Sequence, residues 1–487
     1  MTSTNDIYDL KKKKLGHCCV GEEYLRNEIQ SSGKYGKCAY CHKVGPSYEV
    51  GEFAKRIDKV FNEHYRRTSD EPTALQYIML TDKESDFEWL RDGEPVVEAI
   101  MNAAQVPEAA AADIQKILED QYDDFDDRTM GIETAFSSES YYEEKAVSDA
   151  EWQQDWSSFE QSLKTEARFF SRTAATLLAS IFKGIDTMRS HDGQSLIVDA
   201  GPGTELSSLY RARAFQSDSN LIDALCRPDQ RLGTPPPRRG SAGRMNALGI
   251  SVFYGANDPR VALAEVRPPV GSQVAVARFE VIRSLRLLDL NALGKVHSKG
   301  SIFDAEWTAR LERDMFLRSL SERITKPVMP DDEVFEYLPT QAIADFLATE
   351  ADVPLDGIIF PSVQAEGLNV VLFHKASRVD VLEVPEGTTI TAELGRWCDD
   401  GWERDYSVIE QVPEGSAPCA DDTNGGSHTL AKPVAMPRDL SDIYDWRQLA
   451  LKIDINSVKI HIVRKVEFHT DEHSVKRFRR EKTSPHF

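Results

Sequence analysis

The sequence predicts an α+β protein, with a helical N-terminal domain that carries a zinc knuckle and a second domain that mixes strands and helices. Three observations predict this. In the first 190 residues apolar side chains recur mostly at three- and four-residue spacings, which is the helical period. After Gly193, short strand-like apolar runs alternate with helical stretches. Four of the seven cysteines lie between residues 18 and 41, a crowding that indicates a metal site in a reducing compartment.

Composition and charge exclude several classes of function. A chain of 487 residues is long enough for two or three domains. The net charge of −22 argues against general nucleic-acid binding, which depends on cationic surfaces. No run of 18 apolar residues is present, so we expect no membrane span. The first 15 residues are polar and Lys-rich and lack the apolar core of a secretory signal, so a cytoplasmic location is expected.

The N-terminal cysteines have the spacing of a zinc knuckle. A C-x-x-C pair follows the turn-rich run GKYGK, and two adjacent cysteines precede it. Zinc takes four such ligands at tetrahedral geometry. The candidate ligands are Cys18, Cys19, Cys38 and Cys41, with His17 or His42 left to complete the set. The alternative is a group of reduced cysteines in a small core.

Helical patterns follow the knuckle. Amphipathic helices are expected over residues 52–67, 96–118 and 149–182. The third carries an aromatic stripe, which at helical spacing favours a core position over a base-stacking platform. Residues 1–190 are therefore predicted to form a helical domain.

The second domain is predicted over residues 205–385. Strands are expected at 251–254, 273–281, 285–290, 357–361 and 369–373, and helices at 304–321 and 340–348. Residues 386–487 are expected to be a partly disordered C-terminal extension, with a helix at 439–451 and a strand at 458–466.

The segment 209–265 has the composition of a ligand site. Arginines, a tyrosine and a glutamate are distributed over a loop-rich stretch with short apolar runs between them. This combination suits a phosphorylated, sugar-containing ligand held beside one catalytic carboxylate. A proline-containing loop at 233–240 separates its first arginines from Arg244.

A family resemblance rests on this segment and on two later ones. Its blocks are YRAR at 210–213, GRMNALG at 243–249, VFY at 252–254, AEV at 264–266, YLPTQ at 337–341, DGIIFPS at 356–362 and GLNVVLF at 367–373. In order and neighbourhood they resemble the RES domain, a family named for an arginine, a glutamate and a serine. The helical part ahead of them resembles the HEPN-like domain often found N-terminal to RES domains.

The resemblance implies an ADP-ribosyltransferase-like fold and an NAD+-degrading toxin of a toxin–antitoxin system. NAD+ would then be the substrate and an antitoxin or regulatory protein a partner, with a homo-oligomer left open. The resemblance carries over a catalytic set and an NAD+-binding set. The catalytic set is Glu265, Arg211, Tyr254 and Ser362, and the binding set is Arg211 or Arg213, Arg244, Asn246, Tyr254 and Ser362.

The chemistry of NAD+ cleavage suits these residue types. Breaking the nicotinamide–ribose bond builds positive charge on the anomeric carbon, which a fixed carboxylate such as Glu265 stabilises. Arginines offer bidentate donors to the pyrophosphate. Tyr254 can stack on the nicotinamide ring, and Ser362 can hydrogen-bond ribose or phosphate.

Three functional hypotheses follow. The first is an NAD+ glycohydrolase or phosphorylase, a hydrolase of the glycosidase type. The second is ADP-ribosyl transfer to a macromolecule through the same site. The third is an inactive binding or sensory protein, which the complete set of Arg, Tyr, Glu and Ser residues argues against.

Overall fold

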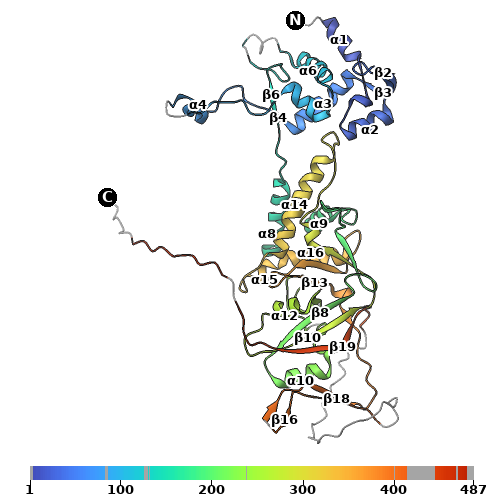
Figure 1. Cartoon of the computed structure of the whole chain (residues 1–487), viewed down its shortest axis with the longest axis vertical. Coiled ribbons are helices and arrows are strands. Elements are labelled where there is room, and N and C mark those ends of the chain that lie inside the picture. Colours follow the sequence, from blue (N-terminus) through green and yellow to red (C-terminus); the bar gives the residue numbers. More distant parts are fainter. Residues whose placement is uncertain are drawn as a thin grey trace. The chain divides into compact units, whose positions relative to one another are not determined.

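A computed structural model describes residues 4–82, 86–124, 130, 132–236, 239–399, 401–413, 445–467 and 470–479 (Figure 1). Its internal contacts divide the chain into two compact units. The first comprises residues 1–157 and 296–319, and the second comprises residues 158–295 and 320–487. Helices α8 (Ala150–Thr165) and α14 (Trp307–Thr325) contribute residues to both.

The first unit combines helices with short antiparallel sheets. Its helices are α1 (Thr4–Lys12), α2 (Glu23–Ser32), α3 (Val50–His64), α4 (Ala74–Thr81), α5 (Val96–Ala104) and α6 (Glu108–Tyr122). Strands β1 (Lys14–Gly16), β3 (Val44–Glu49) and β2 (Lys34–Lys37) form one sheet, and β4 (Tyr65–Arg67), β6 (Tyr141–Glu144) and β5 (Glu94–Pro95) form another. The one-turn helix η1 (His17–Cys19) follows β1.

The core of the first unit is built on α3. Its apolar residues at positions 53, 57, 60 and 61 are buried and pack with α5 and α6. Phe61 stacks on Tyr65 and meets Tyr142 edge-on, so aromatic contacts join the helix to the second small sheet. The apolar side of this helix, which the sequence pattern predicted, thus faces the core.

The second unit is organised around a mixed nine-stranded sheet within the described residues. Its order is β14 (Arg378–Val379), β19 (Leu449–Ile462), β10 (Gln273–Val281), β8 (Ser208–Phe215), β9 (Phe253–Ala256), β13 (Leu368–Leu372), β12 (Gly357–Pro361), β11 (Leu285–Asp289) and β7 (Ile197–Ala200). Pairs β11–β12 and β14–β19 are parallel and the others antiparallel. In Figure 1, β8, β10 and the red β19 lie side by side.

Helices and two small hairpin sheets complete this unit. The helices are α9 (Arg172–Phe182), α10 (Asp218–Cys226), α11 (Pro228–Arg231), α12 (Pro259–Glu265), α13 (Leu290–Leu293), α15 (Glu333–Glu336), α16 (Leu338–Thr349) and the one-turn η2 (His374–Ala376). Strand β15 (Thr389–Glu393) pairs with β18 (Ser407–Gln411), and β16 (Arg396–Cys398) with β17 (Gly401–Glu403).

Several predicted helices differ from the observed ones. The helix expected over 96–118 is two helices, because Gln105 adopts a left-handed φ of 50° and Pro107 follows it. The helix expected over 149–182 is interrupted between α8 and α9. Part of its apolar stripe is buried as expected, namely Trp156, Phe159 and Leu163. Phe170, by contrast, lies between the two helices and is 98% exposed.

The mixture of strands and helices predicted after Gly193 is confirmed, and β10 and β12 have the predicted bounds. The stretch 209–265 was described as loop-rich and no strand was predicted at its start, where residues 209–215 form most of β8. The helix predicted at 439–451 is wrong for its described residues, because 445–448 are not helical and 449–451 begin β19; residues 439–444 lie outside the described part. The strand predicted at 458–466 forms the second half of β19 up to Ile462.

The predicted domain ranges 1–190, 205–385 and 386–487 stay predictions. Residues 389–411 of the expected extension form the two hairpin sheets, β19 joins the main sheet, and residues 414–444 lie outside the described part. None of the helices in the described ranges combines the length and apolarity that crossing a bilayer requires.

Candidate active site

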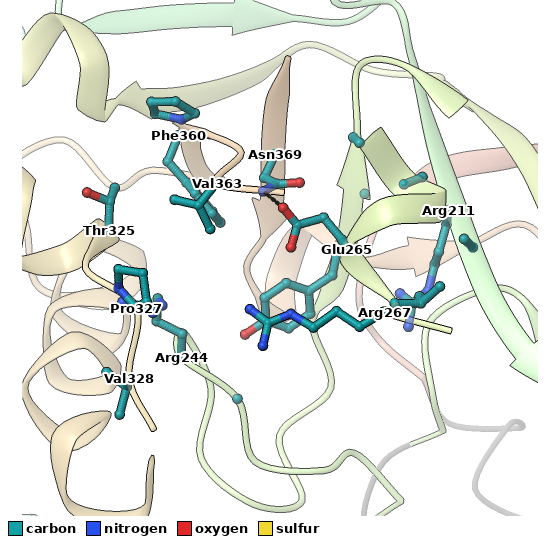
Figure 2. A pocket seen from close by; sticks show the side chains of 18 of the residues that line it. Arg211, Arg244, Glu265, Arg267, Thr325, Pro327, Val328, Phe360, Val363 and Asn369 are labelled. Carbon is teal, nitrogen blue, oxygen red and sulfur yellow. Dashed lines mark hydrogen bonds between the residues drawn. The ribbon is translucent and has the colours of Figure 1, made fainter. Parts of the chain in front are cut away.

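A cavity of about 520 Å³ lies in the second unit and collects most of the predicted site residues. Its walls come from β8, β9, α12, the loop at 242–244, the end of α14 with the residues after it, α15, and strands β12 and β13 with their connection. Arg211, Arg244, Tyr254 and Glu265 all line it. Figure 2 shows Glu265 and Arg211 on one side and Thr325, Pro327 and Val328 on the opposite side.

Glu265 is held by two hydrogen bonds to the same oxygen. Ser362 Oγ donates to Glu265 Oε1 at 2.5 Å. Asn369 Nδ2 donates to the same atom at 2.7 Å, as Figure 2 shows. The Ser362 hydroxyl accepts from the amides of Gln364 and Ala365, which directs its own proton to the carboxylate. Within the described residues no hydrogen bond is made to Oε2, so one carboxylate oxygen stays available to a ligand.

Helix α12 brings Glu265 to the cavity. Asp258 caps its N-terminus and Pro259 occupies the first turn, both favourable helix-start residues. Val261 and Ala262 are buried against β8. Gly367, from the GLNVVLF block, permits this packing, because a Cβ atom at that position would lie only 2.5 Å from the Val261 side chain. Its φ of +147° is also a backbone conformation that residues other than glycine rarely adopt.

Arg211 is a shielded cation without a carboxylate partner among the described residues. Its guanidinium lies 5.0 Å from the centroid of the Phe253 ring, and its buried Nη1 has no hydrogen-bond partner there. Burial, and secondarily the charge of Arg213, lower the pKa of Arg211 to about 10. The side chain therefore remains charged at neutral pH and suits an anionic ligand.

Arg213 points elsewhere. It donates to the carbonyl of Arg231 at 2.8 Å and does not line the cavity. Of the two arginines left open by the sequence, only Arg211 reaches this site.

Tyr254 and Asn246 form one buried unit. The Tyr254 hydroxyl donates to Asn246 Oδ1 at 3.0 Å and accepts from the amide of Met245 at 3.1 Å. Burial raises the pKa of Tyr254 to about 12, so the phenol is neutral. Asn246 is 3% exposed and donates to three backbone carbonyls, so it shapes the loop and does not line the cavity.

Arg244 lines the cavity but is engaged by the backbone. Its Nη1 and Nη2 donate to the carbonyls of Ile324 and Lys326 at 2.5 and 2.7 Å. The predicted YLPTQ block holds the same loop, since Thr340 donates to the Arg244 carbonyl at 2.6 Å and Gln341 to that of Gly243 at 2.9 Å.

Comparison with known proteins matches the part of the chain that holds this cavity to a family. Residues 209–394 match the family model described as the RES domain. This part of the chain is a RES domain. No curated protein matches the chain. One solved structure that matches is the crystal structure of the M. tuberculosis MbcT–MbcA toxin–antitoxin complex, at 14% identity over 41% of this chain and 84% of that one. Its TM-score of 0.21 is too low to establish a shared fold.

The RES domain also places residues at the cavity that the sequence reasoning missed. Asn369 lies inside the apolar strand β13, and its contact with Glu265 spans 104 residues, which no local pattern reveals. Arg267 lines the cavity two residues after Glu265. Its position after the AEV block was the signal that could have found it. The HEPN-like resemblance of the N-terminal part stays a prediction.

A second candidate site lies in the first unit, outside the RES domain. The Sγ atoms of Cys18, Cys19, Cys38 and Cys41 all lie within 4.8 Å of one another. Pairs Cys18–Cys41 and Cys19–Cys38 are separated by 3.0 and 3.7 Å. Zinc–sulfur bonds of about 2.3 Å place tetrahedral sulfur pairs roughly 3.8 Å apart, so this set fits a zinc ion.

Neither histidine is needed for this set. His17 Nδ1 lies 3.2 Å from the carbonyl of Pro46, and His42 adopts a left-handed φ of 60° in the turn after Cys41. The adjacent Cys18 and Cys19 converge because they lie in the single turn η1. Tyr40, within the C-x-x-C turn, donates to Asp113 of α6 at 2.9 Å and ties the knuckle to the core.

Proposed function

We propose that the RES domain cleaves the nicotinamide–ribose bond of NAD+. The observation that carries this proposal is the Glu265 carboxylate, fixed through one oxygen and available through the other, in a cavity with the unpartnered Arg211. The cavity volume lies within the range of about 300–1,000 Å³ typical of ligand sites.

Glu265 and Arg211 would have different roles in the reaction. The free oxygen of Glu265 accepts a ribose hydroxyl and stabilises the positive charge that develops at the anomeric carbon. Arg211 balances the negative pyrophosphate. Water then adds to the anomeric carbon and nicotinamide leaves with the bonding electron pair as a neutral molecule, giving ADP-ribose and one released proton. Inorganic phosphate in place of water would give the phosphorylated sugar.

Product analysis tests the proposal. Purified full-length protein is incubated with NAD+, with and without inorganic phosphate, and the products are separated by chromatography and identified by mass. We expect nicotinamide to appear in equal amount to ADP-ribose, or to its phosphorylated form when phosphate is the acceptor. Intact NAD+ under both conditions would show the proposal to be wrong.

The second candidate function, ADP-ribosyl transfer to a macromolecule, uses the same carboxylate and cation. Label from NAD+ that stays on protein or nucleic acid of a cell lysate would favour it over hydrolysis. NAD+ loss would make the protein a toxin, and expression is then expected to arrest growth unless a cognate antitoxin protein binds it.

The positioning role of Ser362 gives a separate prediction. Ser362→Ala removes one hydrogen bond to a carboxylate, which contributes about 1.5–3 kcal/mol and corresponds to a ~10–100-fold lower kcat. Ser362→Thr keeps the hydroxyl and should retain most of the rate. Steady-state kinetics with melting curves check this. An alanine variant that melts as the parent does and keeps the parent's kcat would contradict the role.

We also propose that the four N-terminal cysteines hold a structural zinc ion. The ion would be bound by the thiolates of Cys18, Cys19, Cys38 and Cys41, a closed set with no open position for substrate.

A further inference from the structure

Three arginines line the cavity of the RES domain, and their guanidinium groups are in three different situations. Arg211 is shielded and lacks a carboxylate partner, Arg244 is bonded to the backbone, and Arg267 is exposed. An anionic ligand can engage only those donors that the protein leaves available. The three situations therefore predict different roles.

Arg244 uses two of its five N–H donors on the backbone. Both terminal nitrogens donate to carbonyls at the end of α14, where the helix dipole is negative and favours a cation. The guanidinium also lies 5.2 Å from the centroid of the Tyr337 ring. These contacts fasten the 242–244 loop to the opposite wall and fix the orientation of the guanidinium, so a ligand could use only the N–H groups that remain in that orientation.

Arg267 is in the opposite situation. Its backbone has a φ of 43°, a left-handed conformation that costs a non-glycine residue about 1 kcal/mol or more. This turn directs the side chain across the cavity below Glu265 in Figure 2. Within the described residues the guanidinium makes no ion pair or hydrogen bond.

We propose that Arg211 and Arg267 together form the diphosphate subsite of this cavity, and that Arg244 is a structural brace. The inference rests on the proposed function and refines it, because it assigns the pyrophosphate to Arg267 where the family resemblance implied Arg244. Two available guanidinium groups match the two negative charges of the diphosphate. The strained turn at Arg267 is then explained as the means of directing that side chain beside the catalytic carboxylate.

Binding of ADP to the full-length protein tests the inference without requiring turnover. Calorimetry should show that Arg267→Gln weakens ADP binding ~10–100-fold, the loss expected for charge-assisted hydrogen bonds. Adenosine, which lacks phosphate, should bind parent and variant equally. Arg260→Gln is the matched control, because Arg260 lies on α12, just ahead of Arg267 in the chain, is exposed and pairs with Asp258. It should leave ADP binding unchanged.

Arg267→Gly separates binding from folding. Glycine adopts the left-handed turn without strain, so the melting temperature should be equal to that of the parent or higher, while ADP binding is weakened as in Arg267→Gln. Arg244→Gln should instead lower the melting temperature, by roughly 2–6 °C, since it frees two backbone carbonyls.

The outcomes distinguish this inference from the proposed function. Arg267 variants that bind ADP within about twofold of the parent would overturn the inference, as would a parent that cleaves NAD+ yet does not bind ADP. A parent that binds ADP through Arg267 but releases no nicotinamide would overturn the proposed function and leave the diphosphate subsite standing.

Discussion

Glu265→Gln is expected to lower the rate of NAD+ cleavage by ~10²–10³-fold, the usual effect of removing one strong electrostatic stabiliser from a transition state. Glutamine has nearly the same shape as glutamate. Its amide oxygen can still accept from Ser362 and Asn369, so the fold and NAD+ affinity should change little. The loss should therefore be in kcat, measured by nicotinamide release, with KM close to that of the parent.

Glu333 provides the matched control for this substitution. Its carboxylate also lines the cavity, but it accepts from the Tyr337 hydroxyl and has no contact with Ser362 or Asn369. Glu333→Gln should therefore keep kcat within about threefold of the parent. If the two variants lost activity equally, or if Glu265→Gln cleaved NAD+ as fast as the parent, Glu265 would not be the catalytic carboxylate.

The double variant Cys38→Ser, Cys41→Ser is expected to lose bound zinc and to unfold the first unit at a lower temperature. Structural zinc sites contribute about 10–16 kcal/mol of apparent binding free energy at neutral pH, so removing two of four thiolates has a large effect. Metal analysis of the parent should give about one zinc per chain, and near none for the variant.

Cys226→Ser is the control for the metal site. Cys226 ends α10 and donates to the carbonyl of Ile390, far in sequence from the knuckle. The Cys226→Ser variant should therefore bind as much zinc as the parent protein. Parent protein without zinc, or a double variant that keeps it, would exclude the proposed metal site.

The sequence was most informative where one local pattern determined the structure. Strand β12 is an apolar run, and β10 contains one and then alternates apolar with charged residues, so their bounds followed directly from the sequence. The cysteine spacing likewise predicted which thiols converge. Strand β8 was missed because Arg211 and Arg213 stand at alternate positions and hide its apolar pattern.

The sequence predicted which residues belong to the site, but it did not predict the contacts between them. Glu265 and Ser362 were named from the family resemblance, yet their hydrogen bond joins positions 97 residues apart. The different roles of Arg244 and Arg267 could not be read from the sequence either, because they depend on two backbone carbonyls at the end of α14 and on one left-handed φ angle. Such differences follow from tertiary packing and not from residue type.

The position of β19 has a consequence for synthesis of the protein. This strand covers the edge of β10, whose other edge pairs with the arginine-bearing β8, and its Ala450, Leu451 and Ile453 are buried in the same core. A nascent chain that has emerged only to residue 394 contains the whole family-matched region, but it leaves the β10 backbone open to unwanted pairing. The sheet around Arg211 can therefore close only after residue 462 has left the ribosome, well after the whole family-matched region has emerged.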